Sequence, residues 1–135
     1  LSALGAEVTG LDHIPESLKL VQRNCELNDV PRVHAQCCCW LDEKGRQQVG
    51  QYDVLVGADV LYESADGIWI HELLTKLLKP GGTAFFGDPQ REGVETFLEK
   101  LGTSGFNVQT HQGETEWMDG REAADVYEIA VGATS

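Results

Sequence analysis

Acidic and aromatic side chains follow directly after a stretch of the chain that predicts a buried β-strand. Residues 53–57 form a nearly continuous apolar run, and Asp59 and Tyr62 come just behind it. In open α/β sheets, ligands bind beyond the carboxyl ends of parallel strands, so side chains delivered there are candidates for chemistry. The structural alternative is an Asp that caps the next turn and a Tyr that packs on the edge of the sheet.

A second predicted strand, at residues 7–11, ends in the same way at Asp12. A carboxylate at such a strand end can accept both hydroxyls of a nucleoside ribose, as it does in dinucleotide-binding folds. The alternative is that Asp12 is an acidic N-cap of the helix that follows. Asp12 therefore predicts a nucleoside site without identifying the nucleoside.

The elements that would position these side chains alternate between helical and strand-like patterns. A helix that starts at Pro15 has Pro in its first turn and Glu16 at the positive end of its dipole. Further helices are predicted at residues 68–78 and 93–101, and further strands at residues 33–40, 83–87, 106–111 and 126–131. This order predicts an α/β fold, with a Rossmann-like, doubly wound, mostly parallel sheet, helices on both faces and an antiparallel closing strand pair.

The remaining segments predict turns and loops. Residues 1–6 predict the last turn of a helix, with Gly5 as its left-handed cap. Residues 41–51 predict a loop or short turn, residues 79–82 a stop and turn, and residues 112–124 a long polar connection. The run at residues 53–57 predicts a strand covered on both faces, because its apolar residues do not alternate with polar ones.

Length and composition narrow the classes of function. The 135 residues suit one domain, and the net charge of −12 argues against a nucleic acid partner, because such binders concentrate Lys and Arg. The sequence contains no run of about 18 apolar residues, so no membrane span is predicted. Three of the four cysteines are consecutive in a predicted strand and alternate between its faces, so they cannot converge on one metal. We expect a cytoplasmic monomer without a metal, whose cysteines are small buried side chains in a reducing compartment.

The order of elements resembles the class I, or seven-β-strand, S-adenosylmethionine-dependent methyltransferases. Four patterns carry this resemblance over nearly the whole chain: residues 8–12 followed by Pro15, Asn24 and Asn28; residues 53–62; residues 77–82; and the closing strand at residues 127–131. The segment from Asp59 to Tyr62 is similar to the acidic-x-x-aromatic motif of the family 16 lysine methyltransferases. Residues 86–91 are similar to the Gly-Asp-Pro-Gly-Arg turn of nicotinamide methyltransferase-like and electron-transfer-flavoprotein lysine methyltransferase-like proteins.

The resemblance implies S-adenosylmethionine as the cofactor. It places Asp12 at the ribose, His13 and Ile14 beside it, and Ile14 and Trp40 at the adenine. Relatives often have an acidic residue for the adenine amino group, and here the nearest acid is Asp42, two residues after Trp40. The alternative for Trp40 is a partly buried core aromatic.

The resemblance also implies an acceptor, which is a nitrogen nucleophile: a protein lysine first and a small nitrogen compound second. The resemblance places Asp59 and Tyr62 at the cofactor methyl, where Asp59 would position the incoming ammonium and Tyr62 would orient the amine and cover the site. Asp88 and Arg91 would pair and shape the substrate rim, although a plain tight turn is the alternative. Trp117 lies in the long polar connection, where a substrate loop is expected.

In this family a first strand and a Gly-rich loop precede the segment that corresponds to residue 1. We therefore expect a longer natural protein, of which residues 1–135 are a single methyltransferase-like domain that is incomplete at its N-terminus. A sheet without that strand would expose two edges. Two other classes stay open: a nucleotide-linked dehydrogenase, which would also use Asp12, and a non-catalytic methyltransferase-like domain that binds a partner and no cofactor.

Overall fold

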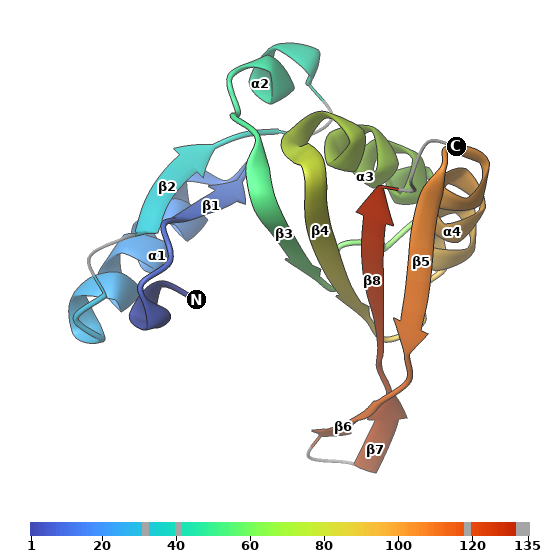
Figure 1. The fold of residues 1–135 in the computed structure, drawn as a ribbon. Helices are drawn as coiled ribbons and strands as arrows, with labels where there is room; N and C mark the ends of the chain where they lie inside the picture. Colours follow the sequence, from blue (N-terminus) through green and yellow to red (C-terminus); the bar gives the residue numbers. More distant parts are fainter. Residues whose placement is uncertain (31–32, 40–41, 118–119, 132–135) are drawn as a thin grey trace. The chain divides into compact units, whose positions relative to one another are not determined.

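The computed structural model describes residues 1–30, 33–39, 42–117 and 120–131. The elements in chain order (Figure 1) are η1 (Ser2–Leu4), β1 (Val8–Asp12), α1 (Pro15–Leu27), β2 (Val33–Cys37), α2 (Glu43–Gln47), β3 (Tyr52–Ala58), α3 (Ser64–Leu77), β4 (Leu78–Asp88), α4 (Gly93–Thr103), β5 (Phe106–His111), β6 (Glu114–Trp117), β7 (Gly120–Ala123) and β8 (Asp125–Val131). The chain divides into two units, Leu1–Val49 and Gly50–Ser135. Within the described ranges, no helix has the length and apolar character needed to cross a bilayer.

In the first unit, β1 and β2 form a parallel pair whose register places Asp12 opposite Cys37. Helix α1 packs on both strands and buries Leu18. It begins at Pro15, as the sequence predicts. The turn of η1 is closed by Gly5, whose φ of 94° lies in the left-handed region, so the predicted cap is also confirmed.

Two boundaries in the first unit differ from the prediction. Strand β2 ends at Cys37 rather than at residue 40, and the predicted loop at residues 41–51 contains the short helix α2. That helix forms because the Asp42 carboxylate accepts hydrogen bonds from the backbone N–H groups of Lys44 (3.2 Å) and Gly45 (3.3 Å).

Cys38 is buried whereas Cys37 is exposed, so the expectation of small buried cysteines is right for Cys38 and wrong for Cys37.

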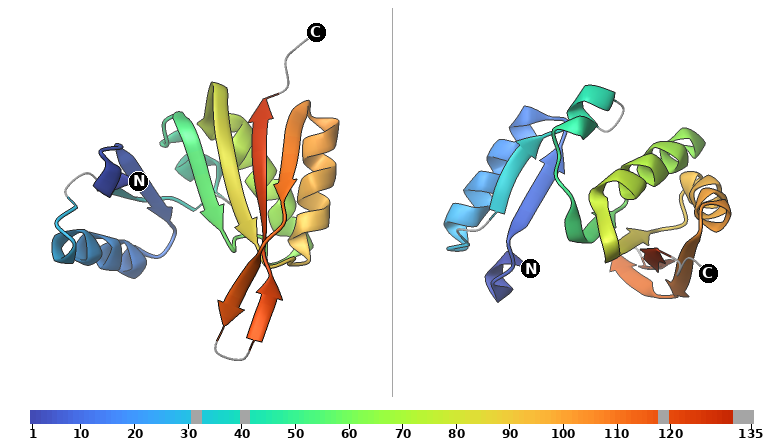
Figure 2. Two further views of the ribbon diagram at one scale, coloured as in Figure 1. Left: turned by 60° about the horizontal axis from the view of Figure 1, so that its bottom comes forward. Right: turned by 45° about the horizontal axis from the view of Figure 1, so that its top comes forward.

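The second unit contains a four-stranded sheet in the order β3-β4-β8-β5. Strands β3 and β4 are parallel, and β8 lies antiparallel between β4 and β5, which confirms the predicted closing pair. Helices α3 and α4 pack against each other and lie on the same face of this sheet (Figures 1 and 2). The buried core of these elements includes Ile70, Leu74, Leu77, Ala84, Phe86, Phe97, Leu101 and Ile129.

The central apolar run of β3 is not covered on both faces, contrary to the prediction. Val54 and Val56 keep 49% and 63% of their surface exposed. They lie beside Thr83 and Phe85 of β4 in the parallel register. An apolar run shows that a strand can be covered on both sides, but it does not show which elements cover it.

Helix α3 begins at Ser64, four residues before the predicted start. A capping box sets this start, because the backbone N–H of Glu63 donates to the Asp66 carboxylate (2.9 Å) and the Glu63 side chain accepts from the N–H of Asp66. Within this helix Ile68 is exposed and Ile70 is buried.

Two segments predicted as connections belong to strands. Residues 79–82 form an irregular part of β4, where the register shifts between Tyr52 and Val54 and Gly81 has a φ of 78°. Residues 112–124 contain the hairpin of β6 and β7, in which Glu114 lies opposite Ala123.

Candidate functional site

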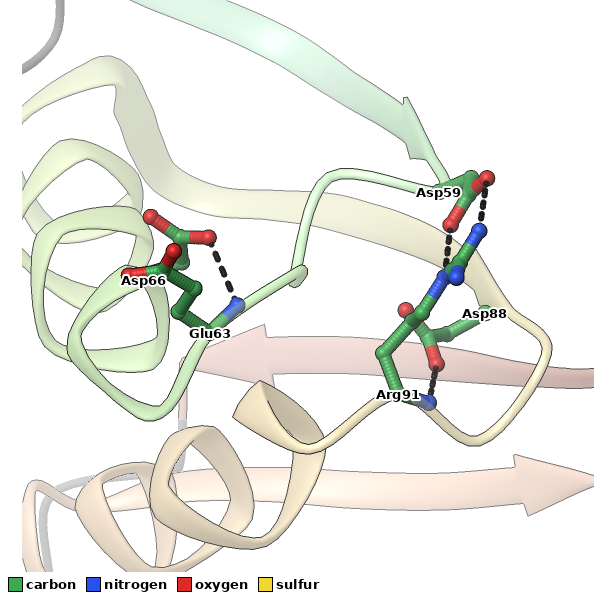
Figure 3. Close-up of polar contacts among 5 residues, drawn as sticks. All are labelled: Asp59, Glu63, Asp66, Asp88 and Arg91. Carbon is green, nitrogen blue, oxygen red and sulfur yellow. Dashed lines mark hydrogen bonds and ion pairs between the residues drawn. The ribbon is translucent and has the colours of Figure 1, made fainter.

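The loops after β3 and β4 bring Asp59 and Arg91 together (Figure 3). The guanidinium Nε donates to Asp59 Oδ1 at 2.8 Å, and Nη2 donates to Oδ2 at 3.0 Å. Both carboxylate oxygens are thus engaged in a two-point pair, the geometry that suits a planar guanidinium. The hydrogen bond from Arg91 lowers the pKa of Asp59 below its usual range.

Tyr62 completes this cluster from the same loop as Asp59. The guanidinium carbon of Arg91 lies 5.2 Å from the centre of the Tyr62 ring, within the range of a cation–π contact. A positive group therefore lies against a carboxylate and an aromatic ring together. The ion pair is accessible to solvent, with side-chain exposures of 44% for Arg91 and 43% for Asp59.

The backbone at Asp59 directs the carboxylate toward the turn after β4. Its φ is 51°, a left-handed conformation that Asp adopts more readily than most residues. Its N–H donates to the carbonyl of Gly87 at 2.8 Å and extends the pairing of β3 with β4 by one residue. The end of β3 is therefore held beside the end of β4 at the point where the loop leaves the sheet.

Asp88 holds the turn that carries Arg91. Its Oδ1 accepts a hydrogen bond of 2.6 Å from the backbone N–H of Arg91, whereas the guanidinium pairs with Asp59. The expected pairing of Asp88 with Arg91 thus occurs through the backbone and not through the side chain. Asp88 is only 2% exposed, and its Oδ2 has no hydrogen-bond partner among the described residues. Burial raises the pKa of Asp88, and the N–H of Arg91 partly offsets this effect.

Two further polar residues, which the sequence did not single out, lie beside Asp88. Asp125 pairs with Asp88 across β4 and β8, and its carboxylate accepts from the side-chain amide of Gln90 at 3.3 Å. Burial, followed by the charges of Asp125 and Asp88, raises the pKa of the Tyr127 hydroxyl. The sequence predicted a strand from residue 126, but not the register that puts Asp125 beside Asp88.

Gly93 allows the loop that carries Tyr62 to pack on the start of α4. A Cβ atom at Gly93 would lie 2.5 Å from the carbonyl oxygen of Glu63 and 2.9 Å from that of Leu61. The Ser64 hydroxyl also donates to Glu92 at 3.0 Å. These contacts fix residues 61–64 against the segment that follows the Arg91 turn.

In the first unit, Asp12 is the last residue of β1. Its Oδ1 accepts a hydrogen bond of 2.8 Å from the backbone N–H of Ile14 and lies 3.7 Å from Nδ1 of His13. The N-cap of α1 is Ile14, without a side-chain cap, so Asp12 is not the N-cap that the alternative reading required. The carboxylate is oriented at the strand end, next to the exposed side chain of Ile14.

The structure therefore groups the predicted site residues within each unit. Asp59, Tyr62, Asp88 and Arg91 lie together in Gly50–Ser135, and Asp12, His13 and Ile14 lie together in Leu1–Val49. Trp40 lies outside the described residues. Trp117 ends β6 and pairs with Gly120, and Asp42 caps α2. Among the residues that the structure describes, no three His, Cys, Asp or Glu side chains are grouped as metal ligands.

Comparison with curated sequences finds methyltransferases, while no family model matches. The chain is 32% identical over 117 residues to EEF1A lysine methyltransferase 3 of Mus musculus. The alignment covers 83% of this chain and 50% of that protein. It is 29% identical over 102 residues to the ubiquinone biosynthesis O-methyltransferase of Albidiferax ferrireducens, covering 76% of this chain and 40% of that protein. The chain thus spans half or less of the length of these relatives.

Solved structures share the fold at low sequence identity. A SAM-dependent methyltransferase from Methanosarcina mazei matches with a TM-score of 0.75 and 13% identity, over 99% of this chain and 85% of that one. An O-methyltransferase from Bacillus cereus in complex with SAH matches with a TM-score of 0.68 and 16% identity, over 93% of this chain and 63% of that one. At such identities the likeness concerns the fold alone.

Proposed function

We propose that this chain, which has the class I S-adenosylmethionine-dependent methyltransferase fold and resembles the lysine methyltransferase branch, serves methyl transfer to a nitrogen nucleophile, namely a protein lysine. The observation that carries the proposal is the cluster at the end of β3, where the Asp59 carboxylate and the Tyr62 ring both contact a cation. A lysine side chain brings a cation to the same kind of site. The likeness to EEF1A lysine methyltransferase 3 supports this acceptor class.

The residues of the first unit suit the ribose of S-adenosylmethionine. The Asp12 carboxylate stands at the end of a parallel strand and is oriented by the N–H of Ile14, and a carboxylate can accept both ribose hydroxyls. Ile14 offers exposed apolar surface beside it for a base. His13 and Trp40 are proposed as neighbours of the nucleoside. When bound, S-adenosylmethionine supplies an electrophilic methyl group.

The proposed role of Asp59 is to position the acceptor and not to act as a base. A free lysine amine has a pKa near 10.4 and must lose a proton before it attacks the methyl group. An Asp carboxylate with an ordinary pKa near 3.9 is already a poor proton acceptor at neutral pH but a good partner for the ammonium. Tyr62 would hold the amine in line with the methyl group and exclude water, and the proton would leave to solvent.

A small acceptor is the second candidate. The likeness to ubiquinone biosynthesis O-methyltransferases supports it, since those relatives are named for a small-molecule pathway. A small nitrogen compound with a positive charge would suit the same Asp59–Tyr62 cluster. A protein substrate, however, also suits the acidic surface implied by the net charge of −12.

The test uses the whole protein. Titration calorimetry with S-adenosylmethionine and with NAD identifies the cofactor, and radiolabelled methyl transfer to a basic peptide is compared with transfer to the same peptide with acetylated lysines. Binding of S-adenosylmethionine with transfer only to the unmodified peptide is expected. Binding of NAD would point to a dehydrogenase, and binding of neither to a non-catalytic domain.

Three expectations from the sequence remain predictions. The first is a single domain completed by an upstream strand and Gly-rich loop, which the upstream coding sequence tests directly. The second is a monomer, which sedimentation measures. The third is a cytoplasmic location, which is tested by fractionation.

A further inference from the structure

The cation position of the proposed acceptor site is already filled by a side chain of the chain itself. Arg91 engages both oxygens of Asp59 and lies over the ring of Tyr62. We infer that Arg91 is an internal competitor of the substrate: it holds the position of the acceptor's cationic group, and the acceptor must displace it. This inference rests on the proposed function, because it specifies how that site selects its substrate.

While Arg91 is in place, a second cation that approaches Asp59 meets a carboxylate whose charge is already paired. The two hydrogen bonds of 2.8 and 3.0 Å use one lone-pair direction of each carboxylate oxygen, and the guanidinium covers the side facing Tyr62. An incoming ammonium would face the positive charge of Arg91 at short range. The acceptor therefore binds well only after the guanidinium has moved away.

The guanidinium can leave without unfolding the turn that carries it. The turn is held by the backbone N–H of residue 91, which donates to Asp88, and by the side chain of Gln90, which donates to Asp125. Neither contact involves the guanidinium. The ion pair is also nearly half exposed, and exposed pairs of this kind are weak enough for a competing cation to break.

This arrangement makes the site selective for charge. A cationic acceptor replaces one ion pair with another and so recovers the interaction that it breaks. A neutral acceptor such as a phenol would break the pair without replacing it. The inferred substrate is therefore a lysine within a basic segment, whose charge competes with Arg91 and is attracted by the acidic protein.

The opposite role for Arg91 would be to orient Asp59 for a productive complex. The two roles predict changes of opposite sign. An internal competitor weakens binding of a basic ligand, so its removal strengthens binding. A positioning residue strengthens binding, so its removal weakens it.

The test variant is Arg91→Gln, and its matched control is Lys79→Gln. Lys79 forms an exposed ion pair of 2.9 Å with Asp53, and its side chain is 44% exposed, as that of Arg91 is. The Lys79 pair joins the opposite ends of the same strands, β3 and β4. Each variant removes one positive charge from the protein, so the control reports the change in the general electrostatic attraction.

The first readout is binding of a fluorescent pentalysine peptide to the whole protein without cofactor. We expect Arg91→Gln to bind about two- to fivefold more tightly than Lys79→Gln, the range by which an exposed ion pair competes. The gain should disappear in the double variant Arg91→Gln with Asp59→Asn. Arg91→Lys, which keeps the charge but loses the two-point pair, should be intermediate. Equal or weaker binding by Arg91→Gln would overturn the inference.

The second readout is methyl transfer to the same peptide. The gain should appear as a lower KM in Arg91→Gln than in Lys79→Gln, and a higher KM would overturn the inference. If no variant transfers a methyl group although all bind S-adenosylmethionine, the proposed function fails. In that case the peptide-binding readout alone decides whether Arg91 competes for the cation site.

Discussion

Because Gly93 packs against the loop that carries Tyr62, we predict that replacing this helical Gly by Ala lowers stability, whereas such a replacement usually raises it. Replacing Gly by Ala in a helix normally stabilises a protein by about 0.5–1 kcal/mol, because Ala has the higher helix propensity. Gly93 is the first residue of α4, yet a Cβ there would lie 2.5 Å from the Glu63 carbonyl oxygen and 2.9 Å from that of Leu61. Both neighbours are backbone atoms, so the clash cannot be relieved by a side-chain rotation.

We expect Gly93→Ala to destabilise the protein. Forcing an extra carbon into a packed contact costs typically about 1–3 kcal/mol, which exceeds the helix-propensity gain at a first helical position. The net loss should be about 1–2 kcal/mol. Since Leu61 is buried, the loop will shift together with Tyr62, and methyl transfer should fall along with stability.

Gly102→Ala is the matched control in the same helix. A Cβ at Gly102 would meet no atom within 4 Å, so only the propensity term remains and stability should rise by up to about 1 kcal/mol. Urea unfolding followed by circular dichroism gives the free energy of unfolding for both variants. If Gly93→Ala were as stable as Gly102→Ala, the reasoning about the Gly93 contact would be refuted.

Three other predictions concern the cofactor, the acceptor and pH. Asp12→Ala should weaken S-adenosylmethionine binding about tenfold or more in calorimetry, since it removes a charged acceptor for the ribose hydroxyls; unchanged affinity would contradict its role. Asp59→Ala should mainly lower the turnover of methyl transfer and leave cofactor affinity nearly intact, and equal losses in both would instead indicate a general defect. Burial lowers the pKa of His71, on α3, below its ordinary value of 6.5, so the unfolded chain takes up a proton first as pH falls. Stability should therefore decline from about pH 6.5 downward until the lowered pKa is passed. In His71→Gln this decline should be smaller than in the exposed control His34→Gln, as measured by thermal unfolding across pH 5–8.

The sequence predicted the fold well wherever local signals determine the backbone. Gly5 takes the left-handed cap, α1 starts at Pro15, and β5 spans residues 106–111 as expected. The resemblance to class I methyltransferases and their lysine methyltransferase branch is confirmed by the comparisons. These successes share a cause, since Pro, Gly and apolar periodicity act on neighbouring residues.

The candidate site was predicted less completely because its contacts join distant residues. The Asp59–Arg91 pair spans 32 positions and depends on the left-handed backbone at Asp59 and Gln90. An Asp or a Gln in a sequence does not by itself predict a left-handed backbone conformation. Asp88 was predicted on the substrate rim, but it is buried, since the register of β4 with β8 turns its side chain inward beside Asp125.

The strained backbone at Asp59 and Gln90 indicates whether the Arg91 side chain is needed to maintain the two loops. Left-handed conformations at residues other than Gly cost about 1 kcal/mol or more and persist only when the surroundings enforce them. At Asp59 the enforcing contact is its N–H bond to Gly87, and at Gln90 it is the pair of side-chain bonds made by Asp88 and by Gln90 itself. None of these contacts uses the guanidinium of Arg91. The shape of both loops is thus maintained without the ion pair, so Arg91 is free to exchange its place on Asp59 with a substrate cation.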